Sequence, residues 1–222
     1  MTQSGLPSTV AAPAFWGQAK RKLAAADPVM ARIIAGHPRV RLKSRGDGFT
    51  TLARSIVGQQ ISVKAADAVW SRLVQRCPQV SPDSLLRRRA ATLRACGLSE
   101  RKTEYLRDLA RHFVDGRVEL SLLAQQPDEH VIESLTDIRG IGRWTAEMFL
   151  IFNLLRPDVF PADDLGLLKA ISRHYLDGEP AAALLRGAGR EKVLQLGAAW
   201  APFRSVATWY LWRSLDPVPV EY

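Results

Sequence analysis

Two adjacent aspartates, Asp163 and Asp164, precede a segment whose apolar spacing predicts a helix over Leu165–Tyr175. Aspartate is among the best residues for capping the first turn of a helix, so one of the two is expected to cap. A carboxylate held beside a reaction centre can stabilise a developing positive charge, or orient and deprotonate a water molecule. A metal site is less favoured, because no third ligand is positioned with the pair. The pair is therefore the leading candidate for chemistry.

A glycine-containing corner lies about twenty residues upstream, between Leu135 and Ala146. A helix predicted over Asp128–Leu135 runs into Gly-Ile-Gly, and a second helix starts directly afterwards. Glycines let a backbone turn tightly and approach another surface, and the free N–H groups at a helix start attract an anion. An ordinary glycine-capped corner would explain the glycines alone. We instead predict a clamp on a DNA phosphate, which positions the protein without reading sequence. The predicted contact residues are Gly140, Gly142, Arg139, Arg143 and Thr145.

The elements that must position these residues are helical. Apolar residues recur at three- and four-residue intervals along most of the chain, and nothing alternates convincingly with period two over more than four residues. Further helices are predicted over Glu191–Trp200 and Phe203–Trp212. The sequence therefore predicts an all-α fold of about ten helices with short connections.

Composition limits the classes of protein that are possible. The chain has 222 residues, 47% of them hydrophobic and 24% charged, which is enough for a buried core. A net charge of +9 and a pI near 10.1 favour polyanionic partners, chiefly nucleic acid or anionic lipid, although a coding bias toward arginine would give the same excess. No apolar run reaches the roughly 18 residues that a membrane span needs. We expect no membrane association.

The cysteine count is equally restrictive. Cys77 and Cys96 are the only two cysteines, and neither has a CxxC neighbour. A disulfide scaffold or a zinc site is therefore not expected, and one chain cannot supply the four cysteines of an iron–sulfur cluster. Because no secretory signal is visible, we expect reduced thiols and a cytoplasmic protein, associated with the nucleoid in a bacterium.

In combination, five segments of the chain resemble the helix–hairpin–helix DNA glycosylase superfamily, in particular its DNA-3-methyladenine glycosylase II branch. These segments are Leu52–Ser62, Cys96–Tyr105, Leu135–Ala146, Val159–Leu167 and Trp200–Ala207. The resemblance covers about residues 35 to 215. Longer members begin with an extra α/β domain, for which the residues before the first motif are too few, so we expect the helical core alone.

The resemblance implies an enzyme of base excision repair. Such an enzyme flips out alkylated bases of the 3-methyladenine and 7-methylguanine type and hydrolyses the N-glycosidic bond, leaving an abasic site. The family pattern places its catalytic carboxylate at Asp164, which leaves Asp163 as the expected helix cap. Bifunctional members carry a lysine directly after Gly-x-Gly-Arg, where this chain has Trp144. Since an indole cannot form a Schiff base, no lyase step is expected.

The resemblance also implies a base pocket and a gap-filling element. Aromatic residues at the positions of Trp144 and Trp212 line the pocket, and Met148 lies one helical turn from Trp144. Indoles favour a positively charged alkylated base by stacking and cation–π attraction. Leu98 is the apolar candidate for the wedge that replaces the flipped base, and Glu100 is the alternative at the family's nominal position. Gln59 and Gln60 are expected beside the orphaned base.

No catalytic cofactor is implied. The backbone carbonyls of Thr136, Ile138 and Ile141 are expected to hold a structural Na⁺ or K⁺, as in the family. Double-stranded DNA with damaged bases is the expected partner, and the protein is expected to be a monomer.

The predicted organisation is a mobile tail over residues 1–13 and two helical subdomains flanking a DNA-binding cleft. Residues 14–47 together with 156–222 would form the subdomain that carries Asp164. Residues 48–155 would form the other, ending in the hairpin.

Two alternatives stay open. One is a glycosylase for another lesion, such as a deaminated or oxidised base. The other is a non-catalytic helix–hairpin–helix DNA-binding module, which would explain the charge and the hairpin but not Asp164 and Trp144. A peripheral membrane protein is supported by the net charge alone.

Overall fold

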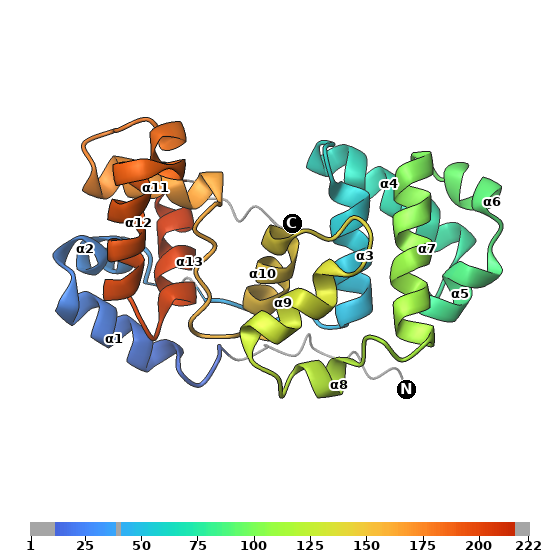
Figure 1. Ribbon diagram of the computed structural model, residues 1–222, viewed down its shortest axis with the longest axis horizontal. Coiled ribbons are helices and arrows are strands. Elements are labelled where there is room, and N and C mark those ends of the chain that lie inside the picture. Colours follow the sequence, from blue (N-terminus) through green and yellow to red (C-terminus); the bar gives the residue numbers. More distant parts are fainter. Residues whose placement is uncertain (1–11, 39–40, 216–222) are drawn as a thin grey trace, which may run out of the picture.

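The computed structural model describes residues 12–38 and 41–215, and in these ranges it is built from helices and connecting turns without a strand (Figure 1). The predicted all-α fold is confirmed. The N-terminal tail predicted over residues 1–13 lies, as far as residue 11, outside the described residues. Cys77 and Cys96 are both buried and unpaired.

One group of helices, the terminal lobe, is assembled from both ends of the chain (Figure 1). Within it α2 and α1 pack on α13, α11 packs on α13, and the 3₁₀ turn η1 packs on α11 and α12. The members are α1 (Trp16–Ala26), α2 (Pro28–Gly36), α11 (Leu165–Tyr175), η1 (Ala181–Leu185), α12 (Gly187–Ala199) and α13 (Arg204–Leu215).

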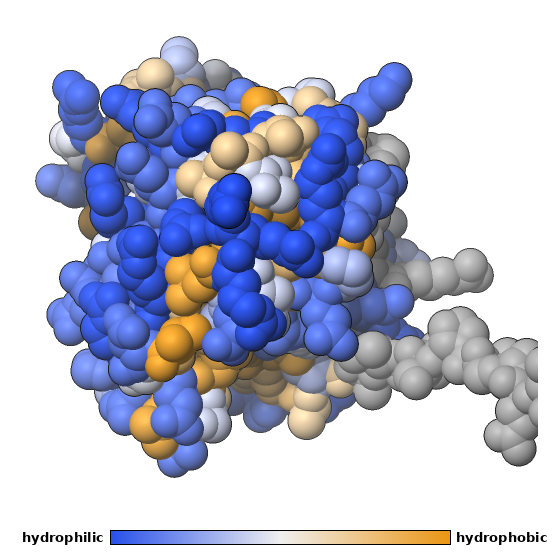
Figure 2. Space-filling model, turned by 90° about the vertical axis from the view of Figure 1, so that its right-hand side faces the viewer, coloured by the Kyte–Doolittle hydropathy of each residue, from blue (hydrophilic) through white to orange (hydrophobic). Residues whose placement is uncertain are grey.

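The second group, the central lobe, is continuous in sequence. Here α3 packs on α4, α7 and α10, α7 packs on α5 and α6, and α9 packs on α10. The members are α3 (Gly48–Gly58), α4 (Val63–Arg76), α5 (Pro82–Arg87), α6 (Ala90–Arg94), α7 (Glu100–Val114), α8 (Leu120–Leu123), α9 (Asp128–Thr136) and α10 (Arg143–Phe152). At the α4–α7 end the surface is mainly hydrophilic, with smaller apolar patches in between (Figure 2).

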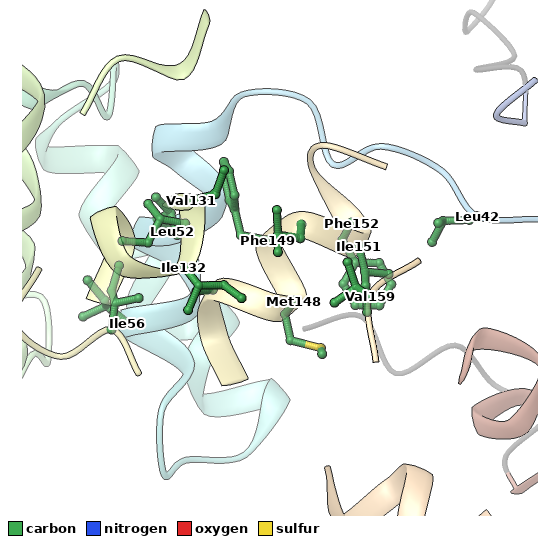
Figure 3. Close-up of a cluster of buried hydrophobic side chains, with 14 of the residues drawn as sticks. Leu42, Leu52, Ile56, Val131, Ile132, Met148, Phe149, Ile151, Phe152 and Val159 are labelled. Atoms are coloured by element: carbon green, nitrogen blue, oxygen red, sulfur yellow. The ribbon is translucent and has the colours of Figure 1, made fainter. Parts of the chain in front are cut away.

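Helix α10 is the core element between the lobes. Every residue from Thr145 to Phe152 is buried, which is typical of a helix surrounded by protein on all sides. Its side chains join those of α3 and α9 in one apolar cluster (Figure 3). At the other end, the Phe152 ring stacks on Trp212 of α13 with ring centroids 5.9 Å apart. Helix α10 is therefore packed between the two lobes, and its last residue contacts α13.

The connection from α10 to α11 carries the chain back to the terminal lobe and ends at Asp164. The start of α13 fixes this connection: Arg204 forms a two-pronged ion pair with Asp158, at 2.9 and 2.8 Å. The Ser205 hydroxyl accepts a hydrogen bond of 2.8 Å from the backbone N–H of Val159. The segment before Asp164 is thus bound to α13 rather than free to swing.

Side-chain caps explain several helix starts. Asp47, Ser62 and Ser99 accept hydrogen bonds from backbone N–H groups of the first turns of α3, α4 and α7. The predicted helix over Glu191–Trp200 begins earlier, at Gly187, where the chain leaves η1.

Asp27 is a half-buried residue whose carboxylate accepts several hydrogen bonds within the terminal lobe. Its carboxylate caps α2 through the N–H of Val29, at 2.8 Å, and accepts hydrogen bonds from the Tyr175 hydroxyl, at 2.6 Å, and the Trp200 indole, at 3.0 Å. Burial alone would raise the pKa of this carboxyl, but the hydrogen bonds outweigh it and lower the pKa below its ordinary value. These hydrogen bonds connect α2, α11 and the end of α12.

We expect Asp27→Ala to lower the free energy of unfolding by roughly 2–4 kcal/mol near neutral pH, because it removes a cap and leaves two partly buried donors unpaired. Since the pKa of Asp27 is lowered in the folded state, its contribution is complete above the ordinary value of 3.8 and is lost as the pH falls through the folded-state value. The deficit of the variant should therefore shrink in acid. Urea unfolding at several pH values measures both effects. Asp67→Ala, which breaks only an exposed ion pair with Arg54, is the control. Equal stability of Asp27→Ala and wild type near pH 7 would contradict the assignment.

Candidate active site and nucleic-acid interface

Three hydrogen bonds fix the carboxylate of Asp164 at the start of α11. Oδ1 accepts from the backbone N–H of Leu167, at 2.6 Å, and from the Trp212 indole, at 2.8 Å. Oδ2 accepts from the Trp144 indole, also at 2.8 Å. The carboxylate therefore has one orientation, set by helices of both lobes. Each oxygen has two lone pairs, so capacity remains for a further interaction.

The predicted division of roles between the two aspartates is wrong in one respect. Asp164, and not Asp163, is the helix cap, since it is the residue that directly precedes α11 and can reach the N–H of Leu167. Asp163 is one residue too early for that contact. Its side chain is largely exposed and forms an ion pair with Arg190 of α12, at 2.8 Å. Asp164 thus combines the cap with the predicted position in the pocket.

The structure brings together the predicted pocket residues Trp144 and Trp212 around Asp164. The Trp144 side chain stands at the start of α10 and is 37% exposed, so part of its ring surface is accessible to a ligand. Trp212 is half-buried on Phe152. Met148 is buried one turn further along α10, and its thioether points away from the labelled apolar cluster (Figure 3). Two indoles and one carboxylate suit a positively charged, flat ligand.

The hairpin between α9 and α10 is packed against α7. Gly140 has φ +89°, and a Cβ added there would lie 2.2 Å from Cδ2 of Tyr105. Its carbonyl accepts a hydrogen bond of 2.7 Å from the Gln59 side chain. The glycine is therefore needed for the contact with Tyr105. Gly142 is exposed, and no atom would crowd a Cβ there. The backbone at the start of α10 is consequently accessible at Gly142.

The other predicted phosphate contacts differ in their surroundings. Arg139 is exposed, and its guanidinium lies 3.7 Å from the carboxylate of Glu104. Thr145 is buried and does not face solvent. The guanidinium of Arg143 is held by two carboxylates, Glu129 at 2.6 Å and Glu147 at 3.1 Å. Arg139 and the backbone at Gly142 are therefore better placed for a phosphate than Arg143.

Glu129 and Glu147 were missed by the sequence analysis. The four-residue spacing of Arg143 and Glu147 on one helix face was an available signal. Burial raises the pKa of the Glu147 carboxyl to about 7, although the nearby Arg143 guanidinium opposes the shift. The hydrogen bond from Arg143 lowers the pKa of Glu129, whose side chain is exposed. Arg143 thus forms ion pairs with two carboxylates whose pKa values are shifted in opposite directions.

The gap-filling predictions are only partly compatible with the structure. Leu98 is 5% exposed and belongs to the apolar core, so its side chain is not available as a wedge from this position. The Gln59 side chain is occupied by Gly140. Gln60 is exposed, with φ +57°, and is followed by Ile61, which is 40% exposed. Gln60 therefore remains the candidate on this turn.

The expected cation ligands lie at the end of α9 and in the hairpin. The Ile138 carbonyl accepts the N–H of Ile141 at 3.0 Å and keeps a second lone pair. Carbonyl oxygens of this kind suit a hard cation. Within residues 12–38 and 41–215, no group of three His, Cys, Asp or Glu side chains could hold a metal ion. No helix in the described ranges is long and apolar enough to cross a membrane.

Comparison with known proteins defines the class. Residues 53–193 match the family model described as HhH-GPD superfamily base excision DNA repair protein. The chain belongs to this superfamily of DNA repair proteins, and its helix–hairpin–helix is the α9–α10 corner.

Several relatives within this superfamily are similar to the chain in sequence or in structure. DNA-3-methyladenine glycosylase 1 of Schizosaccharomyces pombe is 33% identical over 83% of this chain and 80% of its own length. The crystal structure of a DNA-3-methyladenine glycosidase from Bacillus halodurans superimposes with a TM-score of 0.73 at 36% identity, covering 86% of this chain and 90% of that one. A Schizosaccharomyces pombe 3-methyladenine DNA glycosylase in complex with abasic DNA has a TM-score of 0.73 at 31% identity, covering 92% and 98%.

We expect Glu147→Gln to flatten the pH dependence of stability. A group whose pKa is raised in the folded state contributes fully below its unfolded value, and the contribution is lost as the pH rises through the folded value. The wild type should therefore lose stability between about pH 4.5 and pH 7, and the variant should lose less. Urea unfolding near pH 5 and near pH 8 measures the difference.

Glu133→Gln, an exposed glutamate on α9, is the matched control and should behave as the wild type does. If the free energy of unfolding changed with pH in the same way for Glu147→Gln and wild type, the buried carboxyl would not titrate in this range, which would contradict the prediction.

Proposed function

We propose that this protein is a DNA glycosylase that removes alkylated bases of the 3-methyladenine and 7-methylguanine type from duplex DNA. The observation that carries the proposal is the Asp164 carboxylate held between the indoles of Trp144 and Trp212 at the junction of the lobes. The names of the most similar relatives support the same substrate class. Base excision repair is the process defined by the family.

The chemistry follows from the site. A base must leave the duplex stack to be excised. Alkylation at a purine ring nitrogen gives the base a positive charge, and the accessible ring surface of Trp144 would attract it by stacking and cation–π interaction. The same charge makes the base a better leaving group. Cleavage of the N-glycosidic bond leaves a cationic sugar at C1′, which the fixed carboxylate of Asp164 stabilises.

Water is the proposed nucleophile. The residue after Gly-x-Gly-Arg is Trp144, and its indole N–H donates to Asp164. An indole cannot form the Schiff base that a lyase step needs. The product is therefore an abasic site in an intact strand.

The DNA interface is proposed to centre on the hairpin. The backbone at Gly142 and the Arg139 guanidinium would contact phosphates, and Gln60 would lie toward the space left by the flipped base. A monovalent cation, held by the carbonyls of Thr136, Ile138 and Ile141, would add positive charge at the same corner. Phosphate contacts of this kind make affinity strongly dependent on salt.

Asp164→Asn should reduce the release of 3-methyladenine and 7-methylguanine from methylated duplex DNA by at least about 100-fold, because it removes the charge that stabilises the sugar cation. Affinity for duplex DNA containing an abasic-site analogue should stay close to that of the wild type. Base release by chromatography and binding by fluorescence anisotropy, at one fixed salt concentration, measure the two quantities. In the wild-type reaction, strands should break only after alkali treatment.

Asp67→Asn on α4 is the control, since its carboxylate pairs only with the exposed Arg54 among the ion pairs described. Binding without base release by the wild type would contradict the alkylated-base assignment. A panel of deaminated and oxidised bases would then separate another glycosylase from a non-catalytic binding module.

Arg139→Gln should weaken binding to undamaged duplex DNA and reduce the dependence of log K on log salt by about one unit, as expected for the loss of one phosphate contact. Titrations at several salt concentrations give the slope. Arg21→Gln, an exposed arginine on α1, is the control for the same change in net charge. An unchanged slope in Arg139→Gln would exclude this contact.

A further inference from the structure

The loop from Pro161 to Asp164 has little structure of its own, although it carries the carboxylate on which the proposed reaction depends. Pro161 and Ala162 are buried, and the N–H of Asp164 donates to the Pro161 carbonyl at 2.9 Å. These local contacts shape the turn. At its end, the Asp164 side chain is bonded to Trp212 of α13.

The residues before Asp164 are connected to α12 by Arg190, which lies on the first turn of that helix. One of its guanidinium nitrogens, Nη1, donates to the Ala162 carbonyl and lies 2.8 Å from Oδ1 of Asp163. The Arg190 side chain is 27% exposed, so most of it is covered by protein. A single side chain thus binds the backbone and the side chain of the two residues that precede Asp164.

Helix α12 is well placed to act as a support. A Cβ added at Gly197 would lie 2.4 Å from the ring of Phe160. The backbone of α12 therefore lies directly against Phe160, the residue before the loop. Contact at Phe160 and the two Arg190 interactions hold the loop at both ends. Helix α12 therefore contacts the chain at Phe160, Ala162 and Asp163, directly before the catalytic candidate Asp164.

Charge is the second part of the argument. Asp163 is adjacent to Asp164, and an unpaired carboxylate there would add a second negative charge beside the site. Arg190 neutralises it. Asp163 and Arg190 both line a cavity of about 540 Å³. Its other charged lining residues include Glu147 and Arg143 of α10, Glu129 of α9, and the Asp158 and Arg204 pair. In that set Arg190 is the cation that lies against Asp163.

We propose that Arg190 is a positioning residue for the Asp164 carboxylate, which it orients through Ala162 and Asp163 without touching the substrate. This inference rests on the proposed function for its catalytic consequence. Its structural consequence, the orientation of Asp164, can be measured without any substrate.

The substrate-free measurement uses the two indoles bonded to Asp164. The chain has six tryptophans, and each gives one indole N–H signal in a two-dimensional nitrogen–proton NMR spectrum. In Arg190→Gln the signals of Trp144 and Trp212 should shift or broaden, because their acceptor is no longer held in place. The signals of the remaining four should stay where they are. A general loss of stability would not select these two.

The kinetic measurement separates positioning from DNA binding. Arg190→Gln should lower the single-turnover rate of base release from methylated DNA by about 10- to 100-fold, the scale expected when a catalytic group is displaced by about 1 Å. Affinity for abasic-analogue DNA should change by less than about threefold, since Arg190 contacts no part of the proposed DNA interface. Arg190→Lys should recover most of the rate, because an ammonium can still bridge a carbonyl and a carboxylate.

The matched control is Lys192→Gln, which removes one positive charge from the same helix but breaks only an exposed ion pair with Glu179, at 3.2 Å. It should match the wild type in rate and spectrum. Unmoved indole signals in Arg190→Gln would overturn the proposal, whatever the rate. The proposal would also be overturned if the rate of base release by Arg190→Gln fell only by the same factor as its affinity for DNA. If the wild type released no alkylated base, the proposed function would fail, while the indole signals would still decide whether Arg190 orients Asp164.

Discussion

The hydrogen bond between the Trp144 indole and the Asp164 carboxylate is the interaction on which the site depends, because its two partners come from different lobes. Trp144 begins a helix that is buried on all sides in the middle of the molecule. Asp164 begins a helix of the terminal lobe and is held there by its own capping bond. The site exists only where the two helix starts meet. The distance and orientation between Trp144 and Asp164 are therefore set by how the two lobes pack on each other.

The lobes pack through apolar ring contacts at the centre, with ion pairs around them. Phe152 at the end of α10 stacks on Trp212, whose indole N–H reaches Asp164, so the core contact and the site contact share one residue. Arginine–carboxylate pairs surround this centre on the connection between the lobes, as at Arg204 and Asp158. Such pairs contribute little stability when exposed. Their directionality is more useful here, since they fix the course of the connection that delivers Asp164.

Much of this arrangement could be predicted from sequence, and the exceptions have a common physical cause. The helical class follows from apolar periodicity, and the proximity of Asp164 to Trp144 and Trp212 was implied by the resemblance to the glycosylase family. The spacing of residues along the chain does not reveal which distant side chain hydrogen-bonds to a given polar group. Gln59 is bound to a carbonyl 81 positions away, and Arg190 to a loop 28 positions away. The burial of Leu98 depends in the same way on how its loop packs into the core.

The corner formed by α3, α7 and the hairpin has a consequence for how damage would be found. Lys102 donates to the carbonyls of Val57 and Gln59, at 2.8 and 2.6 Å, and Gln59 donates in turn to Gly140. The turn that carries Gln60 and the hairpin are thus joined by hydrogen bonds through Gln59 and Lys102. In the proposed complex both parts would contact DNA, and the duplex would have to deform to fit them. Deformation is cheapest where base stacking is already weak, so this surface would respond to the mechanical compliance of the duplex.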